Sequence, residues 1–356
     1  MKKLLLATAV AALSVSAANA APTVYGKAFV TVDYEDINRN IGDDEDSVQI
    51  NSHASRIGFK GSEALTATTD VIYQLEYGIT IDGADSKGDR TLKNRDTYLG
   101  LKNNTYGEFR FGRNQSSLDR INNVITADGG YWDNLGDDHN MVDSGRIDNS
   151  MIWTAPKYQG LPLEFSAMYG ASESDSSDGW GAALMFDQGT GFTAGLAYDK
   201  DLNLGKNYDG RITNDNGIFV ETKGDIIRGT ATVDLSKFAS VPVTLGALYQ
   251  QAELDGRSKK EKGYVLSAAM GLQNFAKPAT IYTQYNSTSN LRGLDGLDSD
   301  QIVIGGKYFY QPNMIMHAYA GWNDSDLELF ESNGVTGYFK GSNETFTIGT
   351  GLEYKF

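Results

Sequence analysis

Residues 345–356 read T-F-T-I-G-T-G-L-E-Y-K-F, and their side chains alternate between two kinds. The odd-numbered positions carry threonine, glycine, glutamate or lysine, whereas the even-numbered positions are apolar or aromatic apart from Thr350. Because successive side chains of a β-strand point to opposite faces, the stretch predicts a strand with one apolar face and one polar face. The apolar face would carry Phe346, Ile348, Leu352, Tyr354 and Phe356.

The same two-residue period recurs along the chain, and about sixteen segments show it. Forty glycines, 20 tyrosines and only six prolines suit many strands joined by tight turns. We therefore expect an all-β chain with strands at 22–36, 47–61, 67–81, 93–103, 106–115, 146–157, 161–171, 178–187, 191–201, 225–236, 241–254, 262–273, 278–290, 299–311, 314–326 and 343–356.

The connections between these strands alternate between short and long. Short turns are expected at 103–105, 188–190 and 312–313. The long polar connections are 37–46, 82–92, 116–145, 172–177, 202–224, 255–261, 291–298 and 327–342. Short turns on one rim and long loops on the other are typical of an up-and-down outer-membrane barrel, and a soluble sandwich has no reason to alternate in this way.

The first twenty residues have the layout of a secretory signal peptide. Lys2 and Lys3 precede an apolar stretch at 4–15, and Ala18-Asn19-Ala20 offers small residues for cleavage. This order favours a signal peptide over the alternative of a buried apolar helix. We expect cleavage after Ala20, with cleavage one residue later as the alternative, which leaves 21–356 as the mature domain.

Composition narrows the possible classes of protein. The mean hydropathy is -0.38. This low average does not exclude barrel strands, because the apolar and polar positions of each strand cancel in the average. There is no cysteine, so a disulfide framework is excluded. With 46 acidic against 31 basic residues, the net charge of -15 gives no broad basic surface for nucleic acid.

A sheet of this size in a membrane has to close. An open edge in lipid would leave backbone groups without partners, at a cost of several kcal/mol each, so the first and last strands should pair. A barrel of about sixteen strands leaves an aqueous lumen, whereas eight strands enclose only their own side chains. The fold that we predict is a 16-stranded antiparallel transmembrane β-barrel.

Several short motifs, taken in order, resemble those of the Gram-negative general porins, and the resemblance covers essentially the whole mature chain. They are 24–28, 55–61, 95–102, 107–114, 145–150 and the terminal Tyr354-Lys355-Phe356. The resemblance implies a homotrimeric channel in the cell outer membrane whose third loop, 116–145, folds into the lumen. It also implies a row of basic side chains opposite an acidic loop, and it makes Phe356 a signal for the barrel-assembly machinery.

The pleat of the strands indicates which basic residues face the lumen. If Val30 and Val32 face outward, Lys27 faces inward, and the apolar Ile57 places Arg56 inward in the same way. The outward-facing Met151 likewise places Arg146 inward. A basic side chain facing lipid at mid-depth would cost about 2–4 kcal/mol, which also favours the lumen.

The orientation of Arg95 is ambiguous from the sequence. The alternation of Thr97, Leu99 and Leu101 places Arg95 outward, whereas the resemblance places it inward, and we follow the resemblance. The predicted basic wall of the constriction is Lys27, Arg56, Arg95 and Arg146. The alternative is that these residues are merely hydrated lumen residues near a rim.

The third loop supplies the candidate acidic side of the constriction. The resemblance does not fix which carboxylates line it, and we expect Asp128, Asp133, Asp137 and Asp138. The alternative for each is a hydrated aspartate in a turn. Because acidic groups in a pore favour cations, the sequence predicts a weak to moderate cation preference.

No catalytic or metal-binding motif stands out. The three histidines, His53, His139 and His317, lie beside no nucleophile or zinc motif. The acidic run at 295–300 lacks the spacing of a calcium loop, so we expect neither a metal nor another cofactor and no enzymatic activity. The basic run at 257–262 would either contact lipopolysaccharide phosphates or be solvated, and we favour solvation.

The predicted function is passive diffusion of small hydrophilic solutes and ions through the lumen. Its partners would be outer-membrane lipid and lipopolysaccharide, the assembly machinery and the permeating solutes. Two alternatives remain: a channel that prefers one substrate, and an adhesin or receptor barrel with an occluded lumen. An enzymatic barrel is a more distant possibility.

Overall fold

The computed structural model describes residues 22–83, 92–124, 127, 140–157, 161–172, 178–202, 223–330 and 338–356, with the backbone alone at 327–330 and 338–340. The predicted signal peptide lies outside this part of the chain. In the described ranges, no helix has the length and apolar character needed to cross a membrane. The short helices described are η1 (Leu118–Ile121), α2 (Ser236–Ala239) and η3 (Leu291–Gly293).

All the described strands belong to one antiparallel sheet of 17 strands. The strands are β1 (Thr23–Arg39), β2 (Glu45–Ser52), β3 (Arg56–Ala64), β4 (Thr69–Ile79), β5 (Leu92–Asn103), β6 (Gly107–Gln115), β7 (Arg146–Thr154), β8 (Leu163–Gly170), β9 (Gly179–Asp187), β10 (Phe192–Lys200), β11 (Gly224–Asp234), β12 (Val243–Leu254), β13 (Lys260–Leu272), β14 (Ala279–Ser289), β15 (Asp298–Gln311), β16 (Met314–Phe330) and β17 (Tyr338–Lys355).

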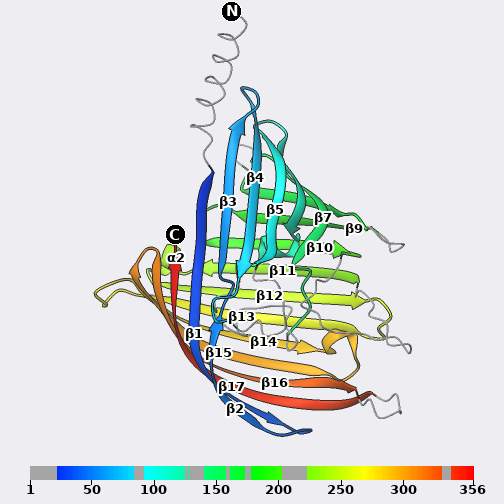
Figure 1. The fold of residues 1–356 in the computed structure, drawn as a ribbon, viewed down its shortest axis with the longest axis vertical. Helices are drawn as coiled ribbons and strands as arrows, with labels where there is room; N and C mark the ends of the chain where they lie inside the picture. Colours follow the sequence, from blue (N-terminus) through cyan, green and yellow to red (C-terminus); the bar gives the residue numbers. More distant parts are fainter. Residues whose placement is uncertain are drawn as a thin grey trace, which may run out of the picture.

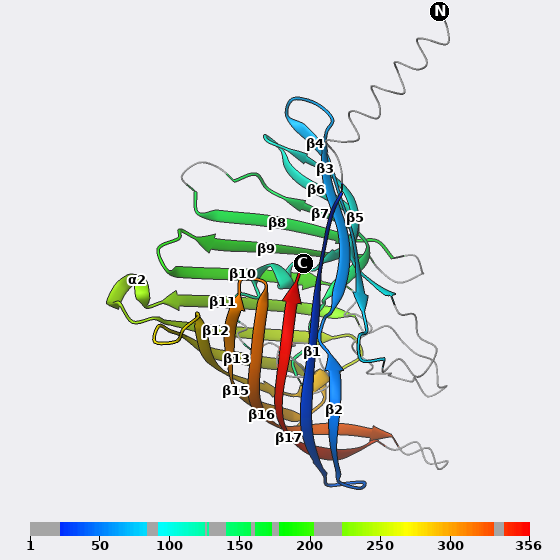
Figure 2. The same cartoon turned by 60° about the vertical axis from the view of Figure 1, so that its left-hand side comes forward.

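The sheet closes on itself. β1 pairs with β17 on one side, from Lys27 opposite Lys355 to Arg39 opposite Asn343, and with β2 and β3 on the other. Each later strand pairs with the next one along the chain, so the ribbon returns to its start (Figures 1 and 2). β2 and β3 follow one another along the same side of β1, so together they cross the barrel wall once, as one strand would. With β2 and β3 counted as one strand, the 17 strands form a barrel of 16, and the predicted 16-stranded barrel is confirmed.

The crossing made by β2 and β3 is interrupted where the sequence predicted a continuous strand. Ala54 has a φ of 46°, a conformation that a residue with a side chain adopts at a cost. Ser55 repairs the gap in the ladder: its hydroxyl accepts from the Phe29 amide at 3.0 Å and donates to the Phe29 carbonyl at 3.1 Å. The bend therefore costs the sheet little hydrogen bonding.

The predicted inward and outward faces agree with the exposure of the side chains. On β17, Phe346, Ile348 and Leu352 are exposed, whereas Thr347 and Glu353 are buried. Because an apolar side chain gains by leaving water, an exposed apolar row on a closed sheet is the surface that faces lipid or another subunit. The polar row of the same strand faces the interior.

Two glycines allow close contacts at the seam between the chain ends. Gly26 and Phe356 exchange backbone hydrogen bonds of 2.9 and 3.1 Å, and a Cβ on Gly26 would lie 2.4 Å from the Phe356 ring. Further along the seam, a Cβ on Gly349 would lie 2.7 Å from the ring of Tyr319. Aromatic rings thus occupy the space that side chains at these glycines would fill.

The lengths of the strands differ most from expectation at the last hairpin. The sequence predicted a loop at 327–342, but β16 and β17 stay paired as far as Phe330 opposite Tyr338. The prediction followed the alternation of apolar residues, whereas backbone pairing needs no apolar face and continues beyond it.

Candidate pore constriction

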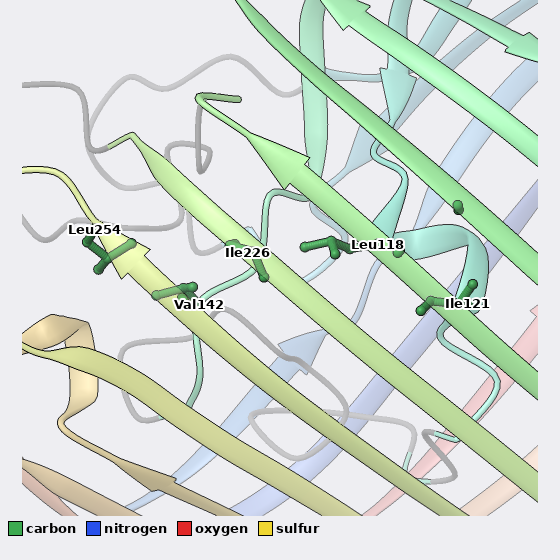
Figure 3. Packing of buried hydrophobic residues seen from close by; sticks show 8 residues of the cluster. Leu118, Ile121, Val142, Ile226 and Leu254 are labelled. Atoms are coloured by element: carbon green, nitrogen blue, oxygen red, sulfur yellow. The ribbon is translucent and has the colours of Figure 1, made fainter.

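The third loop turns into the barrel and packs against its inner wall. Its described parts are 116–124, 127 and 140–145. Figure 3 shows Leu118, Ile121 and Val142 of this loop beside Ile226 of β11 and Leu254 of β12. All of these side chains are buried, at 3% exposure or less, so the loop contributes to a core inside the barrel.

Polar side chains of successive strands bind the backbone of the loop. The Val142 amide donates to Glu261 Oε1 of β13 at 2.8 Å, and its carbonyl accepts from Gln250 Nε2 of β12 at 2.6 Å. Ser267 Oγ donates to the Val124 carbonyl at 2.6 Å, and the Ala127 amide donates to Gln284 Oε1 at 3.3 Å. An irregular backbone buried in this way must find partners, and the wall supplies them.

Arg228 of β11 is the main charged anchor of the loop. Its side chain is fully buried, and Nε donates to Gln250 Oε1 at 2.8 Å. Its two terminal nitrogens donate to the loop residues Asn122, at 2.5 Å, and Asp143, at 3.1 Å. The guanidinium therefore ties both ends of the described loop to one strand.

Asp119 is a loop carboxylate that lies deep in the barrel. It accepts a hydrogen bond from Asn122 Nδ2 at 3.1 Å. Burial and then the neighbouring Asp143 carboxylate raise the pKa of Asp119 well above its usual range, while Arg146 and Arg228 act in the opposite direction. Asp119 thus sits between the anchor of the loop and the basic wall.

On the opposite side of the lumen, two of the predicted basic residues, Arg56 and Arg95, meet around Glu76. Arg95 Nε donates to Glu76 Oε1 at 2.7 Å, and Arg56 Nε lies 3.7 Å from Oε2. Lys27 stands directly opposite Arg56 in the pairing of β1 with β3. The Glu76 carboxylate is 7% exposed, whereas the side chains of Arg56 and Arg95 are 30% and 21% exposed.

Arg95 faces inward because β5 contains a bulge. The register of β4 and β5 shifts between Leu75 and Tyr77, so that Arg95 and Asp96 both oppose Glu76. A bulge places two consecutive residues against one and resets the alternation of faces. Leu99 and Leu101 therefore remain exposed on the outer face, although Arg95 reaches the interior.

Arg146 extends the row beyond β5. Its Nε donates to Asp96 Oδ1 at 2.7 Å, and its side chain is 19% exposed. The four predicted basic residues therefore form a continuous row with Glu76 and Asp96, which we call the charged row. It runs from β1 through β3, β4 and β5 to the start of β7.

The predicted acidic residues Asp128, Asp133, Asp137 and Asp138 lie outside the described residues. Sequence reasoning missed Glu76, Arg228 and Glu261. The alternation of side chains along β4, β11 and β13 could have shown that these three residues point inward, but nothing in the sequence indicated their partners. The partners lie far away along the chain: Arg228 and Asp143, for example, are 85 positions apart.

The two described histidines have structural partners in the wall. His53 Nε2 lies 2.6 Å from Thr31 Oγ1, and the buried His317 lies 3.0 Å from Glu353 Oε2. His139 lies outside the described residues. In the part of the chain that the structure describes, no group of three or more His, Asp or Glu side chains could hold a metal ion.

Comparison with known proteins identifies a family. The family model described as Gram-negative porin matches residues 7–327. A curated relative, outer membrane protein F of Serratia marcescens, is 25% identical over the full length of both chains.

Solved structures share the fold at lower sequence identity. The anion-selective porin from Comamonas acidovorans has a TM-score of 0.67 at 17% identity, and the match covers 95% of this chain and all of that one. The trimer form of OmpT from Vibrio cholerae has a TM-score of 0.60 at 18% identity, over 94% of this chain and all of that one.

Proposed function

Because the chain belongs to the Gram-negative porin family, we propose that it is a passive diffusion channel for small hydrophilic solutes and ions, with a weak to moderate cation preference. As an outer-membrane porin it is a channel protein and not an enzyme. The observation that carries the proposal is a loop held against one wall of the lumen while the opposite wall presents the charged row. Such a lumen screens solutes by size and by charge.

The cation preference follows from the balance of charges in the lumen. Glu76 and Asp96 compensate two of the four positive charges of the charged row. The chain as a whole carries -15. The carboxylates Asp128, Asp133, Asp137 and Asp138 of the third loop would then add negative charge opposite the row and favour cations.

The proposal includes the assembly of the channel. The exposed apolar residues of β17 and its neighbours suit contact with lipid or with another copy of the chain, and we infer a homotrimer. Phe356 would act as the recognition signal for the barrel-assembly machinery. Lipopolysaccharide would meet the extracellular rim.

Conductance in planar bilayers tests the proposal. We expect steady, non-saturating single-channel currents in KCl and a reversal potential that favours K⁺ over Cl⁻ in a salt gradient. Asp128→Asn combined with Asp133→Asn should move the permeability ratio toward unity, because it removes two negative charges from the lumen. The matched control is Asp255→Asn with Asp295→Asn, which removes two exposed charges elsewhere and should change the ratio little.

The outcomes separate the candidate functions. No conductance from correctly folded protein would favour the occluded receptor or adhesin barrel. Currents that saturate with one solute and are blocked by its analogues would favour a substrate-preferring channel. An unchanged ratio in the Asp128 and Asp133 variant would contradict the assignment of these residues and leave the channel intact.

A further inference from the structure

Glu261 of β13 binds two connections that lie far apart in the sequence. Its Oε1 accepts a hydrogen bond from the Val142 amide of the third loop at 2.8 Å, and its Oε2 accepts one from the Arg292 amide at 2.8 Å. Glu261 is 1% exposed, and hydrogen bonds to a buried carboxylate are among the strong ones in proteins. One carboxylate therefore joins the third loop to the connection between β14 and β15.

That connection, residues 290–297, is held in a strained conformation. Leu291 and Leu297 are buried, and the Leu291 amide donates to the Leu297 carbonyl at 2.6 Å. Arg292 has a φ of 58°, a left-handed conformation that a residue with a long side chain adopts at a cost. Because such a conformation persists only where its surroundings hold it, the bond from the Arg292 amide to Glu261 helps to fix the shape of the connection.

The connection between β12 and β13 packs against the same segment. The Lys259 amide donates to the Gly293 carbonyl at 3.3 Å, and a Cβ on Gly293 would lie 2.7 Å from Cβ of Arg257. Asp295 and Gly296, at the tip of the connection 290–297, are exposed. The connection thus has a base packed beside Glu261 and a tip that solvent reaches.

The third loop depends on the same carboxylate from the other side. Val142 is fully buried, so its amide would have no partner in place of Glu261 without rearrangement. If the Arg292 amide moved away, Oε2 of Glu261 would become a buried acceptor without a donor, which is costly. The carboxylate would then turn or draw in water, and either change weakens its bond to Val142.

We propose that Glu261 couples the connection 290–297 to the third loop, so that displacing the connection loosens the loop and alters the current through the barrel. Long connections of outer-membrane barrels lie on the extracellular rim, so the tip at Asp295 and Gly296 can be reached from outside the cell. The coupling between the two loops is independent of the channel function, whereas its effect on the current rests on the channel function proposed above.

The first test measures how fast a cysteine at position 141 reacts with a small methanethiosulfonate reagent in folded barrels. Met141 is fully buried beside Val142, and the chain has no cysteine, so the rate for Met141→Cys reports how tightly the third loop is held. Arg292→Pro removes the amide that donates to Glu261 and should raise this rate about tenfold, the loss of one hydrogen bond to a charged group. The matched control is Ser240→Pro, at a residue with a φ of 53° between β11 and β12, and it should leave the rate unchanged.

Glu261→Ala shows whether the effect passes through the carboxylate. The change removes the acceptor of both amides, so the rate for Met141→Cys should rise, and Arg292→Pro should then add nothing. An unchanged rate with Arg292→Pro, or an equal rise with and without Glu261, would overturn the coupling.

A labelled tip keeps the inference testable if the Arg292→Pro variant fails to fold. Asp295→Cys carrying biotin should give a noisier single-channel current in KCl when streptavidin binds, and adding Glu261→Ala should abolish this response. Biotin on Asp43→Cys, an exposed position between β1 and β2, is the matched control and should give no response. No response at Asp295, or a response that persists without Glu261, would overturn the coupling. A wild-type barrel without current in KCl would instead contradict the channel function, and the reaction rates at position 141 would still test the coupling.

Discussion

Two inner surfaces of the barrel use polar side chains in different ways. Beneath the third loop, on β11 to β14, Arg228, Gln250, Glu261 and Gln284 are each at most 1% exposed, and each binds a loop residue. On the charged row, the arginines are paired with carboxylates, yet 19–30% of each side chain stays exposed.

The difference follows from desolvation. A polar group that is removed from water must be compensated by the protein, so on the loop side each of these side chains is committed to holding the loop. On the charged row water still reaches the ions, so their charges remain available to act on passing solutes. We therefore propose that the first surface is structural and that the second selects among solutes, and substitutions should affect the two differently.

The largest effect is expected on the loop side, from Arg228→Met. The change removes three hydrogen bonds and leaves the Asp143 carboxylate, 11% exposed, without its cation. Removing one partner of a buried ion pair costs about 3–5 kcal/mol. Urea unfolding of the folded barrel should show this loss, and the open-channel current should become noisier as the loop loosens.

The matched control is Arg39→Met at the exposed pair with Glu45, whose side chains are 28% and 58% exposed. Exposed pairs contribute about 0–1 kcal/mol, so the barrel should keep its stability and quiet current. Equal losses in the two variants would remove the distinction between the two surfaces.

A smaller effect, on selectivity, is expected on the charged row from Glu76→Gln. The change frees Arg56 and Arg95 from their shared carboxylate without altering its shape. One unit charge at about 4 Å in water changes an ion's energy by about 1 kcal/mol, or roughly a factor of five in permeability ratio. The reversal potential should therefore move toward Cl⁻, and an unchanged reversal potential would show that the row does not face the permeating ions.

A further effect, on the pH dependence of stability, concerns Asp119. Its pKa is raised in the folded protein, so the folded state binds a proton more readily than the unfolded chain does. The stability contributed by this group is then complete below the usual carboxyl pKa, near 4, and is lost as the pH rises toward the raised value. Asp119→Asn should make the unfolding free energy fall less steeply with pH over that range. An unchanged slope would contradict the raised pKa of Asp119.

The strands were predictable because each carries its own signal. Alternation of apolar residues at 345–356 or 264–272 needs no knowledge of the rest of the chain, and the structure has strands at both places. Alternation also gave the inward orientation of Lys27 and Arg56. Alternation could not give the orientation of Arg95, because a bulge opposite Glu76 shifts the alternation of faces along β5. No residue near the bulge marks it in the sequence.

The contacts of the third loop were not predictable by the same reasoning. Arg228 lies on the inward face of β11, yet whether it lines water or holds a loop depends on Asn122 and Asp143, which only the closed barrel brings near. Long-range pairing of this kind is set by the shape of the whole sheet. The resemblance to known porins supplied the inward fold of the loop but not the residues that hold it.

The central claim is that the third loop lies inside the lumen against the wall, and cross-linking tests it most directly. The chain has no cysteine, and a Cβ on Gly263 of β13 would lie 3.2 Å from Cβ of Met141 in the loop, close to the spacing of a disulfide. Met141→Cys with Gly263→Cys should therefore form a disulfide on mild oxidation and keep its conductance, whereas Met141→Cys with Gly78→Cys, on β4 of the opposite wall, should not cross-link. Failure of the first pair to cross-link in folded, conducting channels would contradict the placement of the loop.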